Sequence, residues 1–281
     1  MGSLGTITEA IVQIVWGLPL VTLITFAGIF LLIYSRLTPF RYLIHALGLL
    51  LRKEGNMCSG GQSHWRALCT ALSGTIGMGN IAGVAIAIST GGSGAIFWMW
   101  IVAILGMSIK FFTCSLSCLY RKRDSKGNLL GGPMYYIELG LGQGHRYLAL
   151  IFAACGMIGC LGIFQANQLS TLIEAQYGLA GTTTGLLMAL AVGLIARGGI
   201  LSVGSFASKA VPIMGLFYLA GSLFVVIAHL DQVPMVLKSI FAGAFEPSAA
   251  IGGAAGLSIR EIIIVGTKRA IFSNEAGVGT E

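Results

Sequence analysis

Several long stretches of the chain are apolar at nearly every position. A helix needs about 20 apolar residues to cross the hydrocarbon core of a membrane, because each residue advances it by about 1.5 Å. Polar and charged residues gather between these stretches. The pattern therefore predicts an all-α membrane protein with about seven spans. The expected spans are residues 11–34, 65–90, 96–120, 147–177, 184–196, 210–230 and 251–267.

The second expected span is rich in glycine at its centre. Glycines stand at positions 74, 77, 79 and 83, with Asn80 among them. Each glycine costs about 1 kcal/mol in a helix interior relative to alanine, so the cluster favours a helix that stops at 77–80 and starts again. Inside a bilayer such a break is tolerated only where it lines a cavity within protein. In secondary transporters, breaks of this kind hold the substrate and the coupling ion.

Composition agrees with the apolar pattern. Hydrophobic residues make up 56% of the 281 residues and charged residues only 10%, against about 25% charged in an average soluble domain. The six cysteines form no CxxC pair, and the four histidines have no metal-ligand spacing. These features argue against a disulfide framework and a zinc site. Sequence motifs of metalloproteases, serine hydrolases and nucleotide-binding enzymes are absent, so we expect no enzyme activity.

The net charge of +7 comes from residues in the expected loops. We therefore expect no nucleic-acid partner. Lysine and arginine collect in the cytoplasmic loops of membrane proteins. With the N-terminus outside, nearly all of the loop lysines and arginines fall on the inside, and only Lys238 falls outside. We therefore expect a multi-pass protein of the inner (plasma) membrane, in contact with the lipid bilayer, with its N-terminus outside.

Residues 73–80 carry the chemistry expected of the broken span. A half-helix that begins there frees N–H groups and presents the positive end of its dipole, which suits a carboxylate. Freed carbonyls and the hydroxyls of Ser73 and Thr75 suit a small hard cation. Close helix packing through small residues is the alternative, but the Asn80 amide needs polar partners at membrane depth. The predicted substrate-binding residues are Thr75, Gly77, Met78, Gly79 and Asn80, and the predicted ligands of the cation are Ser73, Thr75, Gly77 and Asn80.

Other polar residues fall within expected spans. Gln165 and Asn167 lie in the fourth span, where they either line the substrate site or hydrogen-bond to neighbouring helices. Lys110 lies well inside the third span, where it can snorkel, pair with an acid or act as a gate. Asn274 and Glu275 follow the seventh span as further gate candidates. A weak surface salt bridge is the alternative for Glu275.

Five segments, in this order, resemble the motifs of the sodium:alanine symporter family, also known as alanine or glycine:cation symporters. Two positions depart from the family pattern: Ser93 stands where proline is usual, and the glutamate usual shortly after Lys110 is missing. The segments are GTIGMGNIAGVAIAI at 74–88, GGSGAIFWMWIVAILG at 91–106, GGPMYYI at 131–137, FQANQL at 164–169 and FSNEAGVG at 272–279.

The resemblance implies a five-plus-five inverted repeat of the LeuT type, preceded by one extra span. Residues 1–62 would form the extra span and a cytoplasmic connector, residues 63–230 the first repeat, and residues 231–281 the start of the second. Gly253 would join the substrate site near the break in the sixth core helix. No tightly bound cofactor is implied. The coupling ion would be sodium, or a proton in some members.

The implied function is sodium-coupled import of a small neutral amino acid, alanine or glycine, by alternating access. A full member of the family continues with about four or five further spans. The chain is therefore expected to be a truncated form with a partial repeat. The alternative is a non-transporting remnant, or one half of a split transporter that needs a second-half chain.

Overall fold

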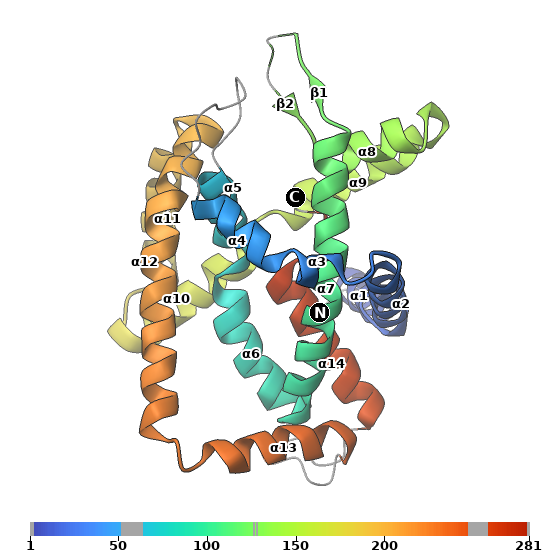
Figure 1. Cartoon of the computed structure of the whole chain (residues 1–281). Helices are drawn as coiled ribbons and strands as arrows, with labels where there is room; N and C mark the ends of the chain where they lie inside the picture. The colour runs from blue at the N-terminus through green and yellow to red at the C-terminus, as the bar shows by residue number, and fades with distance from the viewer. Residues whose placement is uncertain (1–2, 52–63, 126, 128, 247–257, 280–281) are drawn as a thin grey trace. The chain divides into compact units, whose positions relative to one another are not determined.

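The structure, a computed structural model, describes residues 3–51, 64–125, 127, 129–246 and 258–279. Helices make up most of this part of the chain (Figure 1). They divide into two units. Within it, five helical segments are long and apolar enough to cross a membrane, which confirms the predicted all-helical class with several spans. They are Ala10–Tyr34, His64–Gly91, Gly94–Leu119, Gln143–Tyr177 and Gly199–Ala228.

Two helices, α6 (Met78–Gly91) and α7 (Gly94–Leu119), have residues in both units. The other elements belong to one unit each, apart from the last residue of α12. The first unit holds α1 (Ser3–Val15), α2 (Leu18–Tyr34), α3 (Thr38–Arg41), α13 (Val233–Phe245) and α14 (Ile259–Asn274). The second holds α4 (Leu43–Leu51), α5 (His64–Thr75), β1 (Lys122–Arg123), β2 (Leu129–Leu130), α8 (Pro133–Gly140), η1 (Gln143–His145), α9 (Arg146–Gly159), α10 (Ile163–Tyr177), α11 (Gly181–Ala196) and α12 (Gly199–Ala228).

The last expected span has different bounds in the structure. The helix α14 begins at Ile259, where a capping box forms: the Ser258 hydroxyl accepts from the Glu261 N–H, and the Glu261 carboxylate accepts from the Ser258 N–H at 2.8 Å. It continues past the expected end at residue 267 through Lys268 and Arg269, both of which are compatible with a helix. Residues 251–257 of the expected span lie outside the described residues.

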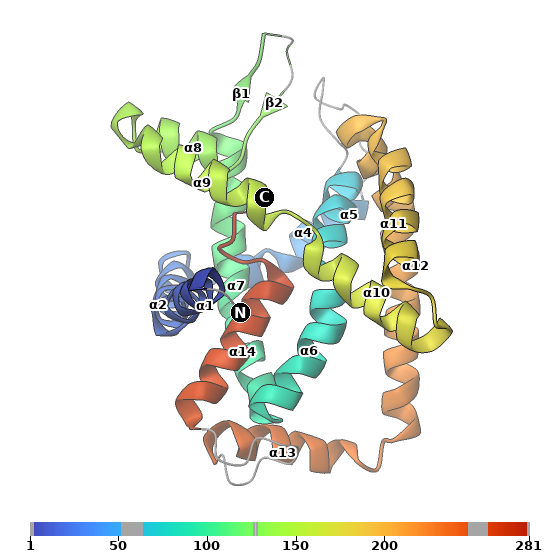
Figure 2. The same ribbon diagram turned by 180° about the vertical axis from the view of Figure 1, so that it is seen from behind.

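In the first unit, α14 packs along α7 through glycine (Figure 2). A Cβ placed on Gly266 would lie 2.6 Å from the Ala95 carbonyl oxygen, and one placed on Gly106 would lie 3.0 Å from the Asn274 amide nitrogen. The two helices therefore run in the same direction, with their backbones in close approach. Ile262 of α14 is fully buried in the core of this unit.

The sequence analysis missed α13, which contacts the start of α7 (Figure 1). A Cβ placed on Gly94 would lie only 2.1 Å from the Gly243 carbonyl oxygen, so the two backbones touch. The Trp98 indole N–H donates to the Ala244 carbonyl at 3.4 Å. Around this contact, aromatic rings of both helices meet edge to face. They are Phe97, Trp98 and Trp100 of α7 with Phe241 and Phe245 of α13.

The same interface explains the serine at position 93. The Ser93 hydroxyl donates to the Ser239 carbonyl at 3.0 Å and accepts from the Ser239 hydroxyl at 3.0 Å. Proline, the residue usual in the resembling family, has no side-chain hydroxyl for either bond. Serine at 93 is thus matched to serine at 239, across 146 residues of sequence.

We expect Ser93→Ala to destabilise the protein more than Ser239→Ala does. The first change removes both hydrogen bonds, whereas the second removes one and keeps the bond to the Ser239 carbonyl. Each bond contributes about 1 kcal/mol. Unfolding in detergent measures the difference, with Ser89→Ala as the control, because the Ser89 hydroxyl bonds only within its own helix. Equal losses of stability in all three variants would contradict the hydrogen bonds between Ser93 and Ser239.

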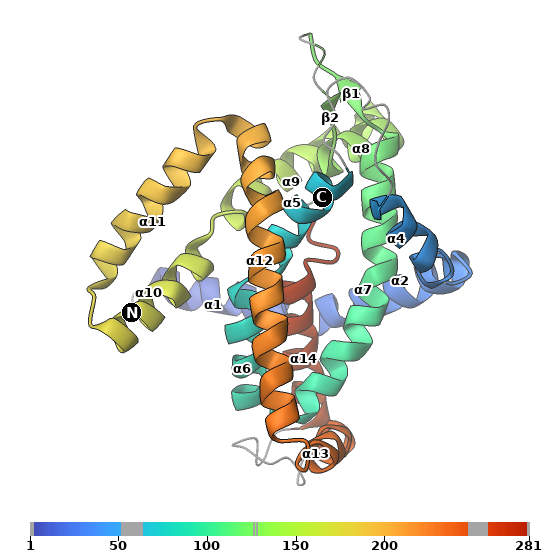
Figure 3. The ribbon, with the colours of Figure 1, turned by 60° about the vertical axis from the view of Figure 1, so that its left-hand side comes forward.

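In the second unit, Cys69 of α5 packs with Ala207 and Val211 of α12 in a small apolar cluster. The helices α10 and α11 form a hairpin (Figure 3). Their connection turns at Gly178, whose φ of +70° favours glycine, and the Ser170 hydroxyl donates to the Gly181 carbonyl.

Candidate functional site

The predicted interruption of the second span is confirmed. The helix α5 ends at Thr75 and α6 begins at Met78, with Ile76 and Gly77 outside both helices. The break lies at the middle of the 28-residue segment His64–Gly91. It starts one residue before the expected position, so that Gly79 and Asn80 fall in the first turn of α6. A break at this place leaves the first N–H groups of α6 without partners in their own helix.

Asn80 ties the two half-helices together. Its side-chain Nδ2 donates to the Thr75 carbonyl at 2.8 Å, and its backbone N–H donates to the Gly77 carbonyl at 3.0 Å. The side chain is half-buried. Thr75 is the last residue of α5, so Asn80 satisfies a carbonyl that the break would otherwise free. The break is therefore a defined turn held by a side chain.

The two hydroxyls predicted as cation ligands donate to their own helix. The Ser73 hydroxyl donates to the Thr70 carbonyl at 2.6 Å, and the Thr75 hydroxyl donates to the Ala71 carbonyl at 3.0 Å. Each hydroxyl oxygen keeps lone pairs that can accept a cation, because its single proton is already engaged. Such oxygens, together with main-chain carbonyls, are the ligands that hard cations prefer.

Space is open beside Gly77. A Cβ placed on this residue would meet nothing within 4 Å, although Gly77 itself is half-buried. Gly79, in contrast, is buried. The side chain of Met78 lies outside what the structure describes, although its backbone begins α6. The open side of Gly77 is where a small ligand could approach the backbone at the break.

Gln165 and Asn167 lie beside a further break that the sequence analysis did not predict. The fourth expected span is divided into α9 and α10 around Gly162, and both amides stand near the start of α10. Both side chains are exposed. In the described part of this unit, no hydrogen bond joins either amide to residues 73–80. The structure thus places them in the same unit as the α5–α6 break, without a direct bond to it.

The helix α14 also ends halfway along a span. Glu275 adopts a left-handed backbone with φ of +53° and donates its N–H to the Ile271 carbonyl, while Gly277 and Gly279 also have positive φ. The last residue, Asn274, lies against Gly106, which stands at the middle of the 26-residue α7. The sequence signal for this end was weak, since αL positions at helix ends favour glycine and asparagine and the residue here is Glu275.

The three gate candidates fall in one unit. Lys110 of α7 is half-buried, one turn after Gly106, which contacts Asn274. The neighbouring Ile109 faces Gly277, so residues 274–277 lie along this stretch of α7. Gly253, predicted as a substrate residue, lies outside the described residues.

Comparisons with known proteins agree with the motifs. A family model described as the sodium:alanine symporter family matches residues 1–281. The chain is 42% identical to an uncharacterized transporter of Haemophilus influenzae, over 99% of this chain and 61% of the relative. It is 36% identical to the sodium/alanine symporter AgcS of Methanococcus maripaludis, over 98% and 61%. It is also 36% identical to the uncharacterized transporter YaaJ of Escherichia coli, over 95% and 56%. The chain thus spans less than two thirds of the length of these relatives.

Proposed function

We propose, because the chain belongs to the sodium:alanine symporter family, that it binds a small neutral amino acid together with a cation at the α5–α6 break. Binding there would serve sodium-coupled import by alternating access. The observation that carries the proposal is the break itself, at mid-span, with Gly77 open on one side and Asn80 fixing the turn. A break of this kind inside a membrane is tolerated where it lines a cavity.

The carboxylate of the amino acid would bind the start of α6. The first N–H groups of α6 have no partners within their own helix, and the positive end of the helix dipole adds to their attraction for an anion. The backbone of Gly77, Met78 and Gly79 supplies these groups. Because Gly77 has no side chain, a carboxylate can reach them directly.

The cation would bind the end of α5. The hydroxyl oxygens of Ser73 and Thr75 and the carbonyls beside the break are oxygen donors of the type that sodium takes. Asn80 would lie between the two ligands, and Gln165, Asn167 and Gly253 would complete the substrate site. A cation placed next to the bound carboxylate lowers the cost of burying both charges, which would couple their binding. Sodium is the proposed coupling ion, and a proton is the alternative.

The end of α14 supports alternating access. It is a second helix that stops at mid-span, opposite Gly106, and Lys110, Asn274 and Glu275 lie near that stop as the proposed gate. Rocking of helices around two such interruptions would expose the site to each side of the membrane in turn. We place the N-terminus outside and the protein in the inner (plasma) membrane.

Uptake by proteoliposomes tests this function. The full-length protein, as the cell makes it, should accumulate labelled alanine or glycine when an inward sodium gradient is applied. Leucine should not be accumulated, since the proposed site accepts only small side chains. Replacing sodium by choline should abolish accumulation unless a proton gradient is applied in place of the sodium gradient. Uptake that is independent of both gradients, or uptake no greater than that of empty vesicles, would contradict the proposal.

A further inference from the structure

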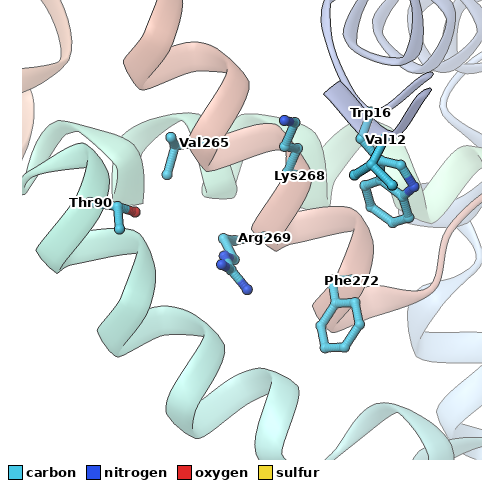
Figure 4. Close-up of a pocket in the computed structure, with 7 residues that line it drawn as sticks. All are labelled: Val12, Trp16, Thr90, Val265, Lys268, Arg269 and Phe272. Atoms are coloured by element: carbon cyan, nitrogen blue, oxygen red, sulfur yellow. The ribbon is translucent and has the colours of Figure 1, made fainter. Parts of the chain in front are cut away.

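The first unit contains a pocket of about 400 Å³ that the proposed transport site does not use (Figure 4). This volume lies within the range of about 300–1,000 Å³ typical of small-molecule sites. One wall is a face of α14 with the helical spacing i, i+3, i+4, i+7. Val265, Lys268, Arg269 and Phe272 form that face, and Val12, Trp16 and Thr90 complete the lining.

Two cations stand side by side on this wall without a carboxylate. Lys268 and Arg269 are both half-buried, and the described part of the chain joins neither to an acid by an ion pair. The neighbouring face of α14, with Ile262, Gly266 and Ala270, packs in the core and against α7. The pocket face thus carries the two cations between the apolar side chains of Val265 and Phe272.

These cations lie between the two ends of a membrane span. Gly266, just before them, touches Ala95 near the start of α7, and Asn274, just after them, touches Gly106 at its middle. A charged side chain at membrane depth is costly unless it has a partner or a wet cavity. Two adjacent cations that no acid among the described residues pairs, with a pocket before them, therefore favour an anion in the pocket.

We propose that this pocket binds the phosphate headgroup of an anionic membrane phospholipid. Arginine and lysine together match a phosphate, with Arg269 as a planar donor and Lys268 as a point charge. Thr90 lies on the same pocket, but its hydroxyl donates to the Ile86 carbonyl at 2.7 Å and supplies no proton to a phosphate. Trp16 and Phe272 offer apolar surface to the glycerol and upper acyl chain. Val12 is 49% exposed, so one rim of the pocket lies at the outer surface of the described chain.

Binding of labelled phosphatidylglycerol to the delipidated protein in neutral detergent tests the assignment. We expect one saturable site per chain that phosphatidylcholine does not fill. Lys268→Gln and Arg269→Gln should each weaken binding about tenfold, whereas Lys268→Arg, which keeps the charge, should keep most of the affinity. Arg260→Gln is the matched control, since Arg260 is exposed on the same helix and lies outside the pocket.

Three results would overturn the assignment. Binding of phosphatidylcholine with the same affinity as phosphatidylglycerol would show that the pocket does not distinguish the charge of the headgroup. An equal loss in Arg260→Gln would show that net charge, and not the pocket, attracts the lipid. Inorganic phosphate that displaces the labelled lipid from the wild type with the affinity of the lipid would assign the pocket to a free anion. Alanine uptake need not change in any of these variants, so the test is independent of the proposed transport site.

Discussion

Gly94→Leu should destabilise the protein by about 3 kcal/mol, more than the loss of either hydrogen bond between Ser93 and Ser239. A Cβ at position 94 would lie 2.1 Å from the Gly243 carbonyl oxygen and 2.3 Å from its carbon. These are backbone atoms, so no side-chain rotation can relieve the overlap, and α13 must move away from α7. Overpacking of this kind costs about 1–3 kcal/mol, and the displaced helix also loses the bonds of Ser239 and Trp98.

The unfolding temperature in detergent measures this effect, with Gly215→Leu of α12 as the matched control. A Cβ at Gly215 would meet nothing within 4 Å, so the same change there should leave the temperature close to that of the wild type. Gly94→Leu should unfold at a clearly lower temperature. Equal behaviour of the two variants would contradict the close contact of α7 with α13.

The sequence predicted those features of the fold that depend on local composition. Apolar stretches of about 20 residues identify spans, because the bilayer imposes their length. The glycines at 74–83 predicted the break within one residue, since glycine acts on the helix in which it stands. The sequence also indicated that Asn80 needs a polar partner, although it did not identify that partner, the Thr75 carbonyl.

The features that the sequence did not predict depend on contacts between distant residues. The helix α14 passes through Lys268 and Arg269 because its other face packs on Ala95 and Trp98 of α7. The charged pair therefore looked like the end of a span when only hydropathy was considered. The helix α13 is short, and its position depends on Gly243 meeting Gly94, across about 150 residues of sequence. Hydropathy contains no information about such pairs.

The candidate site likewise has a part that the sequence predicted and a part that it did not. Residues 73–80 are contiguous, so their chemistry could be proposed from the sequence. The relation of Gln165 and Asn167 to them is a matter of helix placement, which no local pattern determines. The break beside Gly162 was missed although Gly156, Gly159 and Gly162 stand close together, because glycines within an apolar stretch are also typical of close helix packing in membranes.

Gly77→Ala should nearly abolish ligand binding while leaving the fold intact. The structure offers open space for the methyl group, and the backbone φ of Gly77 is not in the left-handed region, so the substitution costs little stability. If the carboxylate of the substrate occupies that space, the methyl group excludes it. We expect affinity for alanine in saturating sodium to fall about 100-fold, which corresponds to about 2.7 kcal/mol. Gly83→Ala of the same α6 is the control, because its Cβ also meets nothing within 4 Å.

Calorimetric titration of alanine, with and without sodium, into the wild type and these two variants tests the α5–α6 break most directly. The predicted result is sodium-dependent binding by the wild type and by Gly83→Ala, and none in the same range by Gly77→Ala at an unchanged unfolding temperature. Sodium-dependent binding of alanine by Gly77→Ala with wild-type affinity would contradict the account.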